Sequence, residues 1–203
     1  CYIHQIPAAI EMIEYLHDLG YETTCNIMAI SQANSKQVEE ALEMLCTTNV
    51  DVIYLVDSYG SLFPENAAEL ARTYLQYAEK AGKKVGFHGH NNQNLAFANT
   101  IETMSYGVSY LDATAQGMGR GAGNCAMELL LGFLKNPKYI LYTLLQFIEK
   151  YMIPLKESGV VWGYDLQYMF TGQLNRHPRE AMAFTADKRK DYCEFYKSLL
   201  END

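Results

Sequence analysis

The sequence predicts an α/β fold built on a parallel sheet, and three patterns lead to that prediction. Segments of strand character and of helical character alternate four times between residues 22 and 134, with about thirty residues from one strand to the next, the length of a βα unit. Segment 51–58 (Asp-Val-Ile-Tyr-Leu-Val-Asp-Ser) is apolar on both faces, which is typical of a strand inside a parallel sheet. After Pro137 only helical patterns occur, so we expect a helical segment to follow the sheet.

Each element has a local signal. An apolar helical stripe starts at Ile6 and is closed by Gly20, Asn34 is expected to cap a helix, and Pro64 is expected to open one that ends near Gly82. The expected strands cover residues 22–30, 51–58, 84–90 and 109–115. The expected helices cover residues 6–19, 34–45, 64–82, 93–106, 125–134, 139–151, 165–172 and 187–200.

Composition and charge exclude several classes of function. Apolar residues make up 49% and charged residues 20% of the chain, as in an ordinary globular protein. The net charge of -8 offers no basic stripe for nucleic acid, and no apolar run is long enough to cross a bilayer. We expect no signal peptide in residues 1–20, and we expect Cys1-Tyr2-Ile3-His4 to be an internal cut in a longer protein.

The five cysteines are scattered, and none forms a Cys-x-x-Cys pair. We interpret them as reduced, buried thiols of a cytoplasmic protein, with cysteine chemistry as the alternative.

The pair His88 and His90 is the strongest chemical signal in the sequence. Residues i and i+2 of a strand point to the same face, so both imidazoles are able to bind one divalent metal. Residues 91–94 (Asn-Asn-Gln-Asn) follow directly and are typical of a loop, so the histidines are expected at the C-terminal end of a strand. Active sites of parallel α/β folds lie at that end. The alternative for an isolated His-x-His is an ordinary surface or core pair.

Polar residues also end the neighbouring strands. Asp57 and Ser58 follow the second predicted strand, and Asp112 lies in the fourth. The fourth strand leads into a Gly-rich loop, in which Arg120 supplies a cation for a carboxylate or phosphate and Asn124 an amide oxygen for a hard metal. The alternatives are a helix cap for Asp57 and a structural, partnered carboxylate for Asp112.

These motifs together resemble the DRE-TIM metallolyases of the HMGL-like family, and most closely their 4-hydroxy-2-oxovalerate aldolase branch. The loop of that branch after its sixth strand resembles Asp57-Ser58-Tyr59-Gly60, and its C-terminal aromatic pair resembles Tyr164 and Tyr168. The resemblance covers most of residues 1–172. It is specific in segments 85–95 (Val-Gly-Phe-His-Gly-His-Asn-Asn-Gln-Asn-Leu), 98–99 (Ala-Asn), 112–113 (Asp-Ala) and 117–124 (Gly-Met-Gly-Arg-Gly-Ala-Gly-Asn).

The resemblance implies a (β/α)8 barrel with Mn²⁺ or Mg²⁺ at its C-terminal mouth, held by residues that match His88 and His90 and, in the HMG-CoA lyase branch, by an asparagine that matches Asn124. The family's first-strand motif, Asp-x-Thr-Leu-Arg-Asp-Gly, supplies a further ligand and an enolate-stabilising arginine, and it does not occur here. The chain therefore resembles strands five to eight, in residues 1–136, followed by a helical C-terminal segment, in residues 137–203. We expect such a half-barrel to bind metal weakly, to lack activity alone and to self-associate.

The implied reaction is metal-assisted retro-aldol cleavage of a 2-oxo acid to pyruvate and an aldehyde. Ser58, next to Asp57, is the candidate for the substrate carboxylate. Tyr168, and less securely Tyr164, would close the pocket over the aldehyde, with Arg120 as the nearby cation. The expected partners are the small substrate, further copies of the chain and an acylating aldehyde dehydrogenase. Two alternatives remain, an acyl-CoA lyase or synthase of the same superfamily and a degenerate, non-catalytic barrel.

Overall fold

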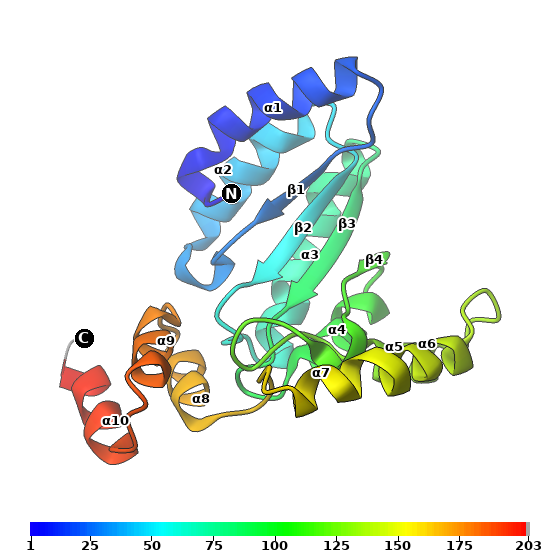
Figure 1. The fold of residues 1–203 in the computed structure, drawn as a ribbon. Coiled ribbons are helices and arrows are strands. Elements are labelled where there is room, and N and C mark those ends of the chain that lie inside the picture. The colour runs from blue at the N-terminus through cyan, green and yellow to red at the C-terminus, as the bar shows by residue number, and fades with distance from the viewer. Residues whose placement is uncertain (202–203) are drawn as a thin grey trace. The chain divides into compact units, whose positions relative to one another are not determined.

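The computed structural model describes residues 1–201, and its four strands form one parallel sheet in the order β1-β2-β3-β4. The strands are β1 (Thr24–Ile27), β2 (Val52–Asp57), β3 (Lys84–Gly89) and β4 (Tyr110–Leu111) (Figure 1). Each connection from one strand to the next contains a helix, which parallel pairing requires. The prediction of an α/β fold with four parallel strands is therefore confirmed.

The chain divides into two compact parts. The first part holds the sheet and consists of residues Cys1–Ser58, Leu62–Gly89 and Ala98–Asp112. The second part consists of Tyr59–Ser61, His90–Phe97 and the chain from Ala113 onward. The predicted division at residue 136 stays a prediction.

Helices of the first part begin where the sequence places start signals. α2 (Ser35–Cys46) starts at Asn34, whose Oδ1 accepts from Gln37 N at 3.0 Å while Gln37 Oε1 accepts from Asn34 N at 3.0 Å. α3 (Pro64–Lys80) has its proline in the first helical position. The remaining elements are η1 (Ile3–Gln5), α1 (Ile6–Asp18), η2 (Ile30–Gln32) and α4 (Ala96–Ser105).

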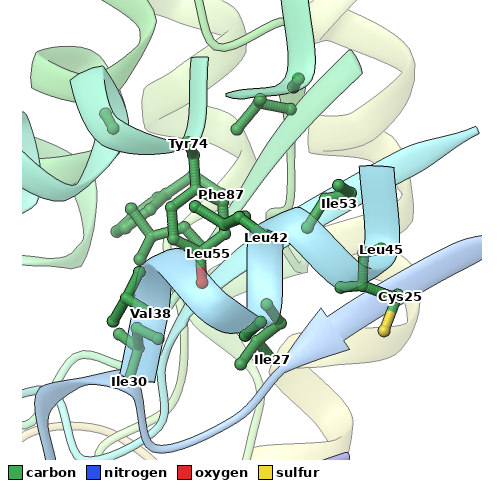
Figure 2. Packing of buried hydrophobic residues seen from close by; sticks show 14 of the residues in the cluster. Cys25, Ile27, Ile30, Val38, Leu42, Leu45, Ile53, Leu55, Tyr74 and Phe87 are labelled. Atoms are coloured by element: carbon green, nitrogen blue, oxygen red, sulfur yellow. The ribbon is translucent and has the colours of Figure 1, made fainter. Parts of the chain in front are cut away.

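The core lies on one face of this sheet. Alternate strand residues, among them Ile27, Leu55 and Phe87, form one cluster with residues of α1, α2 and α3. Figure 2 shows the strand residues beside those of α2 and α3. Tyr74 of α3 and Leu42 of α2 are fully buried within the cluster. Burial of an apolar side chain of this size stabilises the fold by about 1.5–3 kcal/mol.

The opposite face of the sheet carries a second, smaller cluster. Val52, Tyr54 and Val56 of β2 are buried there, and Tyr110 of β4 packs against them. Gly86 is the register partner of both Tyr54 and Tyr110, and His88 follows two residues later on the same face. His88 therefore shares a face with this cluster, away from the main core, whereas Asp57 follows Leu55 by two residues and lies on the core face.

The elements of the second part are helical. They are η3 (Ala115–Gly117), α5 (Met127–Leu134), α6 (Leu141–Phe147), the π-helical turn η4 (Ile148–Met152), α7 (Ile153–Glu157), α8 (Leu166–Gln173), α9 (Arg179–Ala186) and α10 (Tyr192–Glu201). From residue 137 to residue 201 every element is a helix, as predicted. None of the helices within residues 1–201 is both long and apolar enough to cross a membrane.

Several elements differ from the prediction; for example, the expected helix 139–151 is divided into α6, η4 and α7, and the expected helix 187–200 begins only at Tyr192. The expected strand 22–30 is shortened to Thr24–Ile27, because Ala29 adopts a left-handed conformation with φ 54°. The expected strand 109–115 contains only Tyr110–Leu111. Helix α9 was not predicted, since it buries only Ala181 and Phe184 and so shows little periodicity.

Candidate functional site

In the first part, His88 lies at the end of β3 and contacts a carboxylate. Its Nδ1 is 2.9 Å from Oδ2 of Asp112, the residue that follows β4. The backbone N of Asp112 donates to Phe87 O at 3.0 Å, which continues the β3–β4 ladder beyond Leu111. A carboxylate accepts hydrogen bonds only, so this contact places the ring proton of a neutral His88 on Nδ1.

Asp57 and Ser58 follow β2 and make structural contacts in the same part. Asp57 is buried, and its Oδ2 accepts from Leu62 N at 3.2 Å, just before α3. Ser58 Oγ accepts from Ala29 N at 2.8 Å, next to the left-handed turn after β1. Both side chains thus hold the loops at the C-terminal ends of the strands. Their proposed contact with substrate stays a prediction.

In the second part, His90 and Asn124 pair with each other in an isolated antiparallel bridge. Asn91 N donates to Gly123 O at 2.9 Å, so the segment after β3 is joined to the Gly-rich loop by backbone contacts. The side chain of Asn124 donates from Nδ2 to Met118 O at 3.0 Å. Its Oδ1 is buried and has no hydrogen-bond partner within the described residues.

The Gly-rich loop and Tyr168 fit closely together. Gly121 has φ +59°, and a Cβ on it would collide with the ring of Tyr168. Tyr168, in α8, is buried in a cluster with Ala122 and Ala181. A side chain at position 121 would therefore displace the tyrosine, which explains the glycine. Tyr164, by contrast, is 53% exposed and is not buried beside Tyr168.

Arg120, also in this loop, is exposed and acts electrostatically on His177. The pKa of His177 lies below its usual value, because burial disfavours the charged ring and because Arg179 and Arg120 repel it. The ring of His177 packs edge-on against Tyr59, with 5.5 Å between the centroids.

Two donor atoms, one in each part of the chain, are of kinds that bind divalent metals. A metal-binding histidine usually directs its other ring nitrogen at a carboxylate, as His88 does. The buried, partnerless amide oxygen of Asn124 is a ligand that Mg²⁺ or Mn²⁺ accepts. In residues 1–201 no group of three or more His, Cys, Asp or Glu side chains is able to hold a metal ion.

The HMGL-like family model matches residues 4–148, which is more than half of the chain. The chain belongs to the HMGL-like family. The match includes both histidines and the whole Gly-rich loop, so the predicted resemblance is confirmed.

Several curated relatives are named 4-hydroxy-2-oxovalerate aldolase. That of Bacillus thuringiensis (strain Al Hakam) is 27% identical over 207 residues, which cover 97% of this chain and 59% of the relative. That of Geobacillus thermodenitrificans (strain NG80-2) is 29% identical with the same coverage. This chain therefore spans about three fifths of the length of these relatives.

Solved structures show the same fold. The N-terminal domain of a Bacteroides vulgatus protein assigned as an aldolase matches with a TM-score of 0.78 and 30% identity, over 91% of this chain and 61% of the other. An HMG-CoA lyase of Bacillus subtilis matches with a TM-score of 0.63 and 18% identity, over 73% of this chain and 55% of the other. The assignment of the four strands to positions five to eight of a barrel stays a prediction.

Proposed function

We propose that this chain contributes to the active site of a divalent-metal-dependent aldolase, which cleaves a 4-hydroxy-2-oxo acid to pyruvate and an aldehyde. The observation that carries the proposal is the pair His88 and His90 at the C-terminal end of β3, in a chain of the HMGL-like family. The names of the relatives support the substrate class.

In this proposal His88, His90 and Asn124 hold the metal. A bound Mn²⁺ or Mg²⁺ supplies Lewis acidity toward the keto and carboxylate oxygens of a 2-oxo acid. With the ring proton of His88 directed at Asp112, Nε2 of His88 would be the ligating atom, and the buried Oδ1 of Asn124 would be the amide ligand.

The other residues bind the substrate. Ser58, held beside Asp57 at the end of β2, orients the substrate carboxylate, and Arg120 adds positive charge at the Gly-rich loop. Tyr168 excludes water from the reacting aldehyde, which its burial against Ala122 supports. Tyr164 is exposed and takes the lesser role of a cover.

The absent Asp-x-Thr-Leu-Arg-Asp-Gly motif limits what these 203 residues do alone. We propose that the motif's aspartate and arginine complete the site in the whole protein. The isolated chain is then a weak metal binder without turnover. Association with an aldehyde dehydrogenase, through the helical C-terminal segment, stays a prediction.

Calorimetric titration of Mn²⁺ into the chain tests the metal site. The double variant His88→Ala, His90→Ala is expected to abolish binding of micromolar strength, because two of three ligands are lost. The matched control is His4→Ala, His17→Ala, which removes two exposed histidines and is expected to bind like the parent chain. Equal binding by the parent and the His88, His90 variant would contradict the proposal. Absence of binding in every chain would mean that the missing first-strand aspartate is needed.

The acyl-CoA alternative and the non-catalytic barrel are separated from the aldolase by ligand protection. With metal present, pyruvate is expected to raise the melting temperature, and a CoA thioester is not. The reverse result would favour the acyl-CoA enzymes. If the chain binds metal but neither pyruvate nor a CoA thioester raises its melting temperature, a non-catalytic barrel is favoured.

A further inference from the structure

One row on the second face of the sheet contains His88, Asp112, Tyr54 and Tyr110. Tyr54, Gly86 and Tyr110 are register partners across β2, β3 and β4. One step along the strands, His88 is the partner of Val56, and Asp112 follows β4 on the same face. All of these residues belong to the first part of the chain.

The carboxylate of Asp112 has two neighbours in this row, His88 and Tyr54. Its Oδ2 lies 2.9 Å from Nδ1 of His88, and Tyr54 interacts with the same carboxylate, which raises the pKa of the tyrosine hydroxyl. Tyr54 is only 8% exposed, so little water competes for its hydroxyl. The pKa of Tyr54 lies well above its usual value, because of burial and of the charge on Asp112. The hydroxyl of Tyr54 therefore keeps its proton and is able to donate it to a hydrogen bond with Asp112.

Gly86 lets the ring of Tyr54 lie flat across the sheet. A Cβ on Gly86 would come within 2.5 Å of Cε1 of Tyr54 and within 2.6 Å of two further ring atoms. Any larger residue would push the ring away from β3 and its hydroxyl away from Asp112. A glycine ordinarily weakens a strand, and this contact with the ring of Tyr54 explains why Gly86 is found in β3.

We propose that Asp112 and Tyr54 are positioning residues for His88. Asp112 keeps the ring proton on Nδ1, so that Nε2 presents its lone pair to a divalent metal, and Tyr54 holds Asp112 in place. The metal in this inference is that of the proposed function, whereas the tautomer is a property of the metal-free chain.

The physical basis is the choice of tautomer. A neutral imidazole carries one ring proton, and only the nitrogen without it binds a metal. A carboxylate beside Nδ1 only accepts hydrogen bonds, so it favours the tautomer with the proton on Nδ1. An imidazole without this carboxylate is free to place its proton on Nε2. Partners of this kind typically contribute about 10-fold to 100-fold in metal affinity.

The first readout is ¹⁵N NMR of the histidine rings in the metal-free chain, at alkaline pH. His88, identified by the loss of its signals in His88→Ala, is expected to show the Nδ1–H tautomer. Asp112→Ala is expected to shift it toward Nε2–H, and Tyr54→Phe to do so partly. Tyr110→Phe is the matched control, because it removes a hydroxyl from the same row that donates to Glu22 Oε1 at 3.2 Å. It is expected to leave the tautomer unchanged.

The second readout is the affinity for Mn²⁺. We expect a loss of about 10-fold to 100-fold in Asp112→Ala, and of about fivefold in Tyr54→Phe, as one lost hydrogen bond predicts. Tyr110→Phe is expected to match the parent.

An Nε2–H tautomer in the parent chain would overturn the inference. So would an unchanged tautomer in both Asp112→Ala and Tyr54→Phe, or equal effects of Tyr54→Phe and Tyr110→Phe. If Asp112→Ala fails to fold, Tyr54→Phe decides, since it removes a single oxygen. If no chain binds Mn²⁺, the proposed metal site fails in this chain, and the tautomer still decides the inference.

Discussion

His177 shows how the fold changes the chemistry of a single residue. Its ring packs against Tyr59, and the charges of Arg179 and Arg120 act on it. Burial and these charges lower its pKa below the ordinary value of about 6.5. In the unfolded chain the imidazole regains that ordinary pKa, so unfolding takes up protons in mildly acidic solution.

This difference predicts a loss of stability in acid. The contribution of neutral His177 is fully present above about pH 6.5 and is lost as pH falls through the lower, folded-state pKa. His177→Gln is expected to reduce the drop in urea midpoint between neutral and mildly acidic buffer, because glutamine does not titrate. The control is His17→Gln, at an exposed site. If the urea midpoint falls by the same amount in the parent chain and in His177→Gln, groups other than His177 cause the loss of stability in acid.

At the scale of elements, the Gly-rich loop depends on α8. Gly121 and Gly123 both have positive φ, and Gly121 leaves room for the ring of Tyr168. Asn92, in the segment after β3, is buried and donates from Nδ2 to Tyr168 O at 3.1 Å. Elements that are distant in the sequence therefore hold the loop that carries Arg120 and Asn124.

Gly121→Ala is expected to destabilise the chain more than Gly20→Ala does. Both glycines have positive φ, so both substitutions cost more than about 1 kcal/mol in backbone strain. Nothing lies within 4 Å of a Cβ on Gly20, whereas one on Gly121 collides with Tyr168. Urea unfolding of both variants measures the difference. Equal losses would mean that the Tyr168 ring moves aside without cost.

At the scale of the whole chain, the sheet has two edges. Within residues 1–201, β1 pairs only with β2, and β4 only with β3. Contacts of Cys1 N with Asn26 O and of Met28 N with Cys1 O, both at 2.8 Å, cover part of the β1 edge. Strand edges promote pairing with further chains unless charge or bulk opposes it.

We therefore predict that the chain self-associates. Light scattering over a range of concentrations is expected to give masses above that of one chain. Thr24→Lys places a charge at an exposed position of β1 and is expected to lower the mass, as lysines do on natural edge strands. A monomer at every concentration would contradict the prediction.

The local sequence determined the repeating architecture of this protein. Periodicity and start signals such as Asn34 and Pro64 predict most elements, because helix and strand patterns are short-range properties. The spacing of His88 and His90 places them near a strand end for the same reason. The family motifs in residues 85–124 added the chemistry that these patterns alone do not specify.

Only the tertiary structure decided which side chains contact the site residues. The carboxylate of Asp112 meets His88, 24 residues away, and it also acts on Tyr54, two strands from β4. Asn124 retains a partnerless, buried Oδ1, and the fourth strand ends after two residues. Such contacts depend on strand register and on loop paths, and these follow from packing over the whole sheet, which no local pattern contains.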